Sequence, residues 1–256
     1  MAQEKPTSRN IRLLIEYNGA RYAGWQFQHN ADSIQGQLLN ALEQLTGERP
    51  SIRVAGRTDA GVHAIGQVAT FFTNSNLPIV RFAPGLNNFL PDDISIHEAV
   101  DAPPDFDARH DSKSKRYGYR AYTAPQPAAL EIERAWQMRD ALDVDAMREA
   151  TKPLIGHLDF NAFRSVHCDA KHARRDMYSI DIQTYPRPPR GLHIQIIFHA
   201  NAYCRHMCRI IAGTLIEVGR GKRSIESVAH ALHSRDRCQA GMTAPANGLT
   251  LLEVIY

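Results

Sequence analysis

The sequence is short of the features that mark secreted and membrane proteins. Its 256 residues contain only four cysteines, without the paired spacing of a disulfide framework. No apolar run approaches the roughly 20 residues that cross a bilayer. The polar start, MAQEKPTSRN, lacks the apolar core of a signal peptide. We therefore expect a globular protein with reduced thiols and a cytoplasmic location.

Zinc-binding and low-complexity patterns are also missing. The twelve histidines are scattered, and no H-x-x-E-H type motif occurs. Cys204, His206 and Cys208 are close in sequence, in a stretch whose spacing predicts a helix. On a helix His206 would point away from the two thiols, and two further ligands would be needed. The sequence therefore predicts no metal site.

Charge is distributed unevenly along the chain. The net charge is +3, but residues 1–110 carry 9 Lys and Arg against 12 Asp and Glu, whereas residues 111–256 carry 21 against 15. A polyanionic partner would explain a basic second half, because lysines and arginines that neutralise phosphates release counterions. A solvated basic face is the equally favoured alternative. The basic clusters are SKSKR (112–116), KHARR (171–175), RPPR (187–190) and RGKR (220–223).

Hydrophobic periodicity predicts a similar order of elements in both halves. In the first half, Ser33 is placed to cap a helix and Gly47 to end it. The expected elements there are a strand over 11–17, a helix over 34–46, strands in SIRVAG and QVATFFT, a helix after Pro78 and a strand over 94–100. In the second half they are strands over 115–123, 176–185, 191–200 and 248–256 and helices over 143–155, 203–218 and 224–235.

Each half reads β-α-β-β-α-β, the order of a ferredoxin-like unit. The pattern predicts a mixed α/β fold of the α+β class, in which two such halves join their sheets around a central cleft. We place the first half at residues 1–108 and the second, more basic half at residues 109–256.

The stretch AGRTDAGVHA, residues 55–64, presents one carboxylate, Asp59, on a tight turn between two predicted strands. A phosphate-binding loop is disfavoured, because no G-x-G-x-x-G or G-K-[ST] pattern occurs there and an acid would repel phosphate. Asp59 and His63 alone are too few for a metal site. Two interpretations remain from the residues: a side chain bonded to its own turn, and a catalytic acid.

Several blocks of the sequence resemble the TruA family of tRNA pseudouridine synthases. The most specific is GRTDAGVHA, which carries the aspartate that this family requires. The resemblance covers essentially the whole chain. Other blocks in the same order are IEYNGARYAGWQFQ with SIQGQLLNALEQL, NNFLPDDI, FDARHDSKSKRYGYRAY, FNAFRS, NAYCRHMCRIIAGTLIEVG and GLTLLEVIY.

The resemblance implies an isomerase that converts uridine to pseudouridine at positions 38, 39 and 40 of the tRNA anticodon stem-loop. It implies no cofactor, because the reaction only breaks the N1–C1′ bond and rejoins the base through C5. It also implies a homodimer with one tRNA spanning both subunits. Asp59 would be catalytic, whether it attacks C1′, adds to C6 or abstracts the C2′ proton.

Further roles follow by position in the matching blocks. Arg209 would pair with Asp59 and keep it ionised, Tyr117 would stack on the uracil and assist proton removal from C5, and Leu249 would lie against the flipped base. The residues alone allow a solvated helix arginine, a core aromatic and a core leucine at these three positions. The helix block departs from the family pattern around the arginine, with Cys208 and Ile210 as its neighbours.

Four other arginines are candidates for RNA contacts. Arg57, beside the aspartate, would brace the gap that the flipped base leaves; a salt bridge within the hairpin is the alternative. Arg109, Arg164 and Arg175 would bind phosphates without reading sequence. The segment CDAKHARRD lacks a proline that the family pattern has near Ala173.

Two other functions share some of these features. A tRNA-binding or folding module with vestigial activity would have the same fold and basic half without needing Asp59. A glycosidic-bond hydrolase would use one carboxylate to stabilise an oxocarbenium ion, but such enzymes usually need a second carboxylate, and none accompanies Asp59 in its motif.

Overall fold

The computed structural model describes residues 8–187 and 191–256. The first seven residues of the polar start and the last three of the RPPR cluster lie outside these ranges. Backbone contacts divide the chain into two compact units: residues 1–113 with 251–256, and residues 114–250. The sequence-based division after residue 108 left the C-terminal segment in the second half, whereas the contacts place its last six residues in the first unit.

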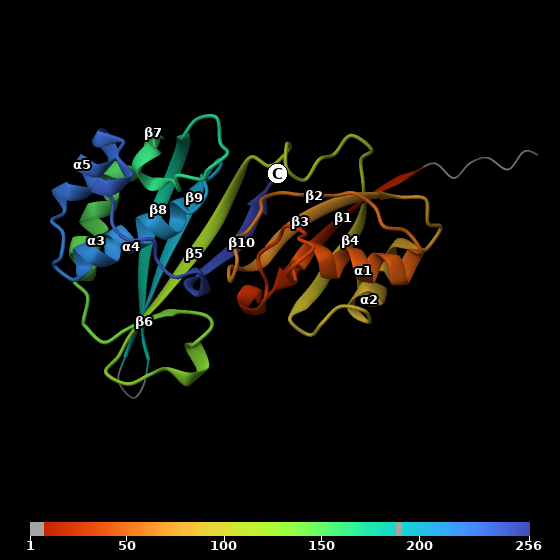
Figure 1. Cartoon of the computed structure of the whole chain (residues 1–256), viewed down its shortest axis with the longest axis horizontal. Coiled ribbons are helices and arrows are strands. Elements are labelled where there is room, and N and C mark those ends of the chain that lie inside the picture. Colours follow the sequence, from red (N-terminus) through yellow and green to blue (C-terminus); the bar gives the residue numbers. More distant parts are fainter. Residues whose placement is uncertain (1–7, 188–190) are drawn as a thin grey trace, which may run out of the picture. The chain divides into compact units, whose positions relative to one another are not determined.

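The first unit has the β-α-β-β-α-β order of a ferredoxin-like unit. Its strands are antiparallel in the order β4-β1-β3. Strand β2 pairs with residues 69–71 of β3, and β10 (Leu249–Ile255) is another neighbour of β3. Helices α1 and α2 lie on one face of this sheet (Figure 1). The elements are β1 (Arg9–Tyr17), α1 (Ile34–Thr46), β2 (Ile52–Val54), β3 (His63–Thr73), α2 (Phe82–Asn87) and β4 (Ile94–Ala102).

Helix α1 confirms the prediction made for residues 34–46. The Ser33 side chain accepts a hydrogen bond from the Gly36 amide, which satisfies one of the free N–H groups at the helix start. Gly47 ends the helix with a left-handed φ of 76°, which glycine adopts without strain. Ile34, Leu38 and Leu42 form the buried face. Local signals alone were therefore sufficient to bound this helix.

Strand β1 supplies the centre of the first core. Ile11, Leu13, Ile15 and Tyr17 alternate along it, and each is buried. The β1–β3 register is regular as far as Ile15, which lies opposite Gln67, and it shifts before Tyr17. This irregularity lies next to the connection that carries Asp59.

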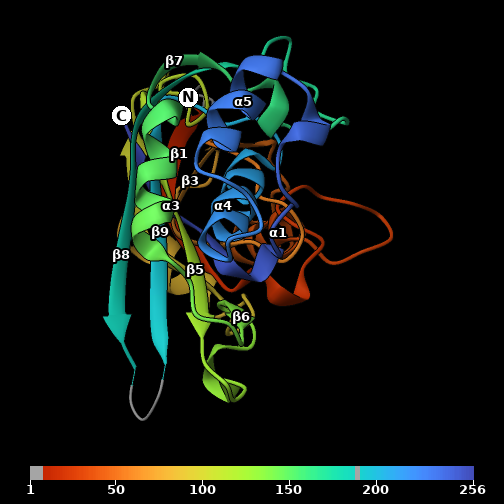
Figure 2. The same ribbon diagram turned by 90° about the vertical axis from the view of Figure 1, so that its left-hand side faces the viewer.

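The second unit has the β-α-β-β-α part of this order, with additional elements. Strand β5 pairs with β9, β9 with β8 and β8 with β7, all antiparallel, and β6 adds a short parallel pairing to β5. Helices α3 and α4 lie along this sheet (Figure 2). The elements are β5 (Ser114–Thr123), β6 (Trp136–Met138), α3 (Val144–Thr151), β7 (Gly156–Asp159), β8 (Arg174–Pro186), β9 (Leu192–Ala200), α4 (Met207–Gly219) and α5 (Glu226–Ser234).

The start of α4 differs from the prediction of a helix over 203–218. His206 has a left-handed backbone with φ 65°, and the Met207 amide donates to the carbonyl of Cys204, so the helix begins only at Met207. Cys204 therefore precedes the helix, and the prediction that it shares a helix face with Cys208 is wrong. Within residues 8–187 and 191–256, no group of three or more His, Cys, Asp or Glu side chains is arranged to hold a metal ion.

None of the helices in the described ranges combines the length and apolar character that a membrane span requires.

Candidate active site

Asp59 lies in the connection between β2 and β3, as the sequence predicted for the turn. The connection is closed by the Ala55 amide donating to Val68 O at 2.9 Å and the Val62 amide donating to Asp59 O at 3.1 Å. Gly61 has φ 76°, a conformation that side chains with a Cβ rarely adopt. Asp59 itself is half-buried. The carboxylate is thus carried on a short turn of defined backbone conformation.

The loop after β1 packs against this turn. The Trp25 amide donates to Thr58 O at 3.0 Å, and the Gly61 amide donates to Tyr22 O at 3.3 Å. Gly24 has φ 99°, and a Cβ at this position would lie 2.7 Å from Thr58 O. The YAGWQ and GRTDAG stretches are far apart in sequence but form one substructure, because the glycine allows the two backbones to approach.

His63 also joins these two segments. The Gly19 amide donates to His63 Nδ1 at 3.1 Å, and the imidazole is buried at the start of β3. This ring nitrogen is an acceptor, so it carries no proton in this arrangement. His63 therefore stabilises the loop after β1.

Three buried polar side chains are hydrogen-bonded at the turn, and one of them, Thr58, belongs to the turn itself. The Tyr17 hydroxyl is 2.7 Å from Thr58 Oγ1, and Gln67 Nε2 donates to Tyr17 Oη at 3.3 Å and to Gly56 O at 2.8 Å. Burial raises the pKa of Tyr17 to about 12, against the opposing effect of its bonds with Thr58 and Gln67. None of these three residues was predicted from the sequence to have a function. Gln67, a polar residue among the apolar residues of β3, was the only signal.

Arg57 and Arg109 are exposed arginines of the first unit. Within the described residues Arg57 makes no salt bridge, so the alternative of an ion pair within the hairpin is not seen. The Arg109 backbone is fixed by its amide, which donates to Asp107 Oδ1 at 2.8 Å, while its side chain is exposed. Both positions are compatible with phosphate contacts.

Asp107 is the anchor of the turn before Arg109. It accepts from the amides of Arg109 and His110, and its Oδ2 is 2.7 Å from an Arg53 guanidinium nitrogen. Burial opposes ionisation of this carboxyl, but the two amides and Arg53 more than compensate and lower its pKa to about 2. This carboxylate is therefore structural and charged at neutral pH.

Tyr117, in the second unit, is buried on β5 opposite Phe198. Its ring meets that of Tyr203 edge to face, with centroids 5.0 Å apart. The Tyr203 hydroxyl in turn donates to Lys115 O at 3.0 Å. The ring is thus held by packing, as a core aromatic would be, and its predicted stacking on uracil stays a prediction.

Arg209 and Leu249 are brought to one segment of the second unit. Arg209 Nε donates to Ala244 O at 2.8 Å, and the Ala244 amide donates to Arg209 O at 3.1 Å. Four residues later Gly248 lies so close to Tyr119 that a Cβ would be 2.6 Å from the Tyr119 ring. Leu249 follows and is buried. The segment that ends at Ala244 therefore supports Arg209, and the close contact of Gly248 fixes the backbone directly before Leu249.

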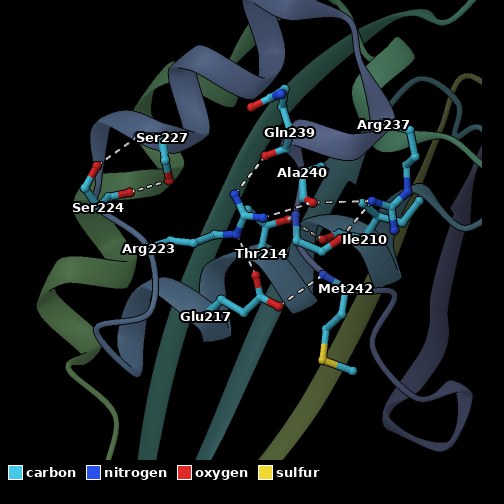
Figure 3. Close-up of polar contacts among 11 residues, drawn as sticks. Ile210, Thr214, Glu217, Arg223, Ser224, Ser227, Arg237, Gln239, Ala240 and Met242 are labelled. Carbon is cyan, nitrogen blue, oxygen red and sulfur yellow. Dashed lines mark hydrogen bonds and ion pairs between the residues drawn. The ribbon is translucent and has the colours of Figure 1, made fainter.

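A polar network connects residues 239–242, which come shortly before Ala244, to helix α4 and Arg223 (Figure 3). Glu217 accepts from Arg223 Nε at 2.5 Å and from the Met242 amide at 3.3 Å. Arg223 also donates to the carbonyls of Gln239 and Ala240, at 2.8 and 3.1 Å. The Gly241 amide donates to Thr214 Oγ1 at 2.9 Å. Arg223, one of the basic cluster at 220–223, is thus engaged inside the fold.

Arg164 and Arg175 bond to backbone carbonyls around the loop between them. Arg175 is buried, and its Nη1 donates to the carbonyls of His172 and Arg174, at 3.1 and 2.6 Å. Arg164 Nη1 donates to Ala170 O at 3.2 Å. Exposed Arg205, whose Nη1 donates to His167 O at 3.3 Å, borders the same loop and was not singled out from the sequence.

Comparison with known proteins gives the family. The profile described as tRNA pseudouridine synthase matches residues 13–111 and 150–256, which include the Asp59 turn and α4. A protein of Pelobacter propionicus named tRNA pseudouridine synthase A is 45% identical, over 97% of this chain and 100% of its own length. Proteins of the same name from Myxococcus xanthus and Geotalea uraniireducens are 44% and 43% identical, over 96% and 97% of this chain and 91% and 100% of their own lengths. The chain therefore belongs to the tRNA pseudouridine synthase family.

Proposed function

We propose that this chain converts uridine to pseudouridine at positions 38, 39 and 40 of the tRNA anticodon stem-loop. Membership of the family supports the reaction and the tRNA substrate. The observation that supports the site best is the placement of half-buried Asp59 on a turn that the YAGWQ loop and three buried side chains hold rigid. A carboxylate placed so firmly can be oriented toward one reacting atom.

In the proposed reaction the N1–C1′ bond of uridine breaks, the uracil turns and a C5–C1′ bond forms. The C5 hydrogen then leaves as a proton and N1 takes up a proton, so atoms and electrons balance without an oxidant, a metal or a cofactor. Asp59 acts in its ionised form. Attack on C1′, addition to C6 and abstraction of the C2′ proton all require the carboxylate to be charged and close to the nucleoside.

Three side chains complete the proposed site on the strength of the sequence resemblance. Arg209, from its place in the matching sequence block, is proposed to pair with Asp59 and keep it ionised. Tyr117 stacks on the uracil and assists removal of the C5 proton. Leu249 gives the base an apolar surface.

The target uridine must leave its stack to react, at a cost of a few kcal/mol. Arg57, which is exposed one residue before Thr58, is proposed to brace the gap. Arg109 and Arg164 are proposed to contact phosphates and set the position of the tRNA without reading its sequence. Arg175, which is buried and bonded to two carbonyls in the free protein, is proposed to reach a phosphate only when its loop moves on tRNA binding. We further propose a homodimer in the cytoplasm, with one tRNA bound across both subunits.

The test uses tRNA tritiated at C5 of uridine, the wild-type protein and Asp59→Asn. Release of tritium to water by the wild type, and none by a folded variant that still binds tRNA, is the expected result. Binding without release from folded wild-type protein, across several tRNAs with anticodon-stem uridines, would favour an RNA-binding module instead. Free uracil among the products would show a glycosidic-bond hydrolase.

A further inference from the structure

Gln67, Tyr17 and Thr58 form a continuous hydrogen-bonded chain beside Asp59. All three are buried, with 0%, 2% and 7% of their surface exposed. The chain runs from Gly56 O to Gln67 Nε2, on to the Tyr17 hydroxyl and then to Thr58 Oγ1. It therefore begins three residues before Asp59 and ends at the residue directly before it.

A break in the β1–β3 register brings two of these side chains together. Ile15 lies opposite Gln67, so a regular antiparallel ladder would place Tyr17 opposite Ile65, but Tyr17 lies opposite Ala64. One extra residue is thus inserted in β3. Such bulges bend a strand and redirect side chains, and they are frequent beside active sites.

The direction of the hydrogen bonds that Gln67 makes follows from the chemistry of its groups. Gln67 Oε1 accepts from the Val68 amide at 3.2 Å, and its Nε2 can only donate. Tyr17 Oη accepts one of these N–H groups and also shares a hydrogen bond of 2.7 Å with Thr58 Oγ1, in which either hydroxyl can be the donor. Each member of the chain thus fixes the orientation of the next.

The backbone of the same segment is fixed independently. Gly56 O accepts from Gln67, and Thr58 O accepts from the Trp25 amide. Thr58 is therefore held at both its side chain and its carbonyl, which leaves Asp59 attached to a residue with little freedom. A misplacement of a reacting group by about 1 Å can lower a rate about 100-fold.

We propose that Gln67, Tyr17 and Thr58 are positioning residues that orient the Asp59 carboxylate for the reaction. The proposal rests on the catalytic role proposed for Asp59. These three side chains would then affect the rate of the chemical step, in addition to the stability of the fold.

The experiment compares Tyr17→Phe, Thr58→Val and Thr58→Ser with a matched control, Thr73→Val. Thr73 is also buried on β3, and its hydroxyl bonds to Glu48, away from the turn. The steady-state kcat and KM for tRNA are measured at a temperature where circular dichroism shows every variant to be folded. Tyr17→Phe and Thr58→Val are expected to lower kcat about 10- to 100-fold with little change in KM.

The conservative and control variants separate positioning from folding. Thr58→Ser keeps a hydroxyl and is expected to stay within about threefold of the wild-type kcat, and Thr73→Val is expected to keep it whatever its loss of melting temperature. Tyr17→Phe combined with Thr58→Val should be little worse than either alone, because both break one chain. Should one variant fail to fold, the comparison of the other with Thr73→Val decides.

Asp59→Asn, measured alongside, distinguishes the two proposals. Wild-type kcat in folded Tyr17→Phe and Thr58→Val, with activity lost in Asp59→Asn, would overturn the positioning role and leave the proposed function intact. Activity retained by Asp59→Asn would overturn the catalytic role of Asp59 itself. An equal loss of kcat in Thr73→Val would show that the effect is one of folding, and would also overturn the positioning role.

Discussion

The turn that carries Asp59 and the segment that supports Arg209 are stabilised by different chemistry. Under the Asp59 turn the bonds are made by neutral, buried groups: an amide, a phenol and a hydroxyl. Along residues 239–244 they are made by an ion pair, Arg223 with Glu217, and by arginine N–H groups on backbone carbonyls. The side chains of this pair keep 25% and 19% of their surface exposed.

The difference predicts how each support responds to its surroundings. Neutral groups in a dry interior respond little to salt, and a bond broken there leaves a buried polar group unsatisfied. Partly exposed charges are screened by salt, and each such ion pair contributes less to the free energy of unfolding. We therefore expect single substitutions to destabilise the Asp59 turn strongly and the segment that supports Arg209 only moderately.

The largest effect on stability is expected from Gly24→Ala. Its φ of 99° is strained for alanine, and the new Cβ would lie 2.7 Å from Thr58 O, so the loop or the turn must shift. We expect a loss of about 2–4 kcal/mol in the free energy of unfolding. Urea denaturation measures this loss, and the tritium-release assay should show a greater loss of activity than Gly221→Ala causes.

Gly221→Ala is the matched control, since Gly221 also has a positive φ, 67°, but nothing lies within 4 Å of its Cβ position. It is expected to cost only about 1 kcal/mol. Equal losses for the two variants would mean that the close approach of the YAGWQ loop to the turn is unimportant.

The next effect tests a charged anchor within the first unit. The pKa of Asp107 is lowered from 3.8 to about 2, so the folded state favours the ionised form. Its contribution, on the order of 2 kcal/mol, is fully present above about pH 4 and is lost as the pH falls toward 2. Unfolding free energies of wild type and Asp107→Asn should differ most at neutral pH and converge near pH 2.

Asp107→Asn keeps an acceptor for the amides of Arg109 and His110, but it removes the charge together with the oxygen that accepts from Arg53. A constant difference between the two proteins from pH 7 to pH 2 would contradict the lowered pKa. By contrast, the unfolding free energies of wild type and Tyr17→Phe should differ by a constant amount from pH 7 to pH 2, because no group in the hydrogen-bonded chain beside Asp59 titrates in that range.

A smaller effect is expected in the Arg209 support. A double-mutant cycle with Glu217→Gln and Arg223→Gln should give a coupling energy of about 1 kcal/mol at low salt, because the pair is partly exposed but also bonded to the backbone. The coupling should fall when the salt concentration is raised to 1 M. A coupling energy that does not change with salt would show that this ion pair is as insensitive to salt as the neutral hydrogen bonds at the Asp59 turn.

The sequence predicted those features of the fold and of the candidate site that depend on contacts between residues close together in the chain. Helix α1 was bounded correctly because Ser33 and Gly47 act within one turn of its ends. The start of α4 was placed four residues early, because the left-handed backbone of His206 leaves no trace in hydrophobic periodicity. The turn around Asp59 was found by its motif, but the function of Gln67 depends on a bulge between distant strands. Strands β6 and β7, of three and four residues, were too short to show a period.

The smallest effect separates arginines that hold the fold from those available to RNA. Arg57 is exposed and makes no ion pair within the described residues, whereas Arg223 is committed to Glu217 and two carbonyls. If Arg57 contacts a phosphate, Arg57→Gln should weaken tRNA binding several-fold and reduce the slope of log K against log salt by about one. Arg223→Gln should leave that slope unchanged, because its charge is already neutralised in the free protein. Fluorescence-anisotropy titrations at several salt concentrations measure both slopes, and equal slopes for the two variants would remove the distinction between a structural and an RNA-facing arginine.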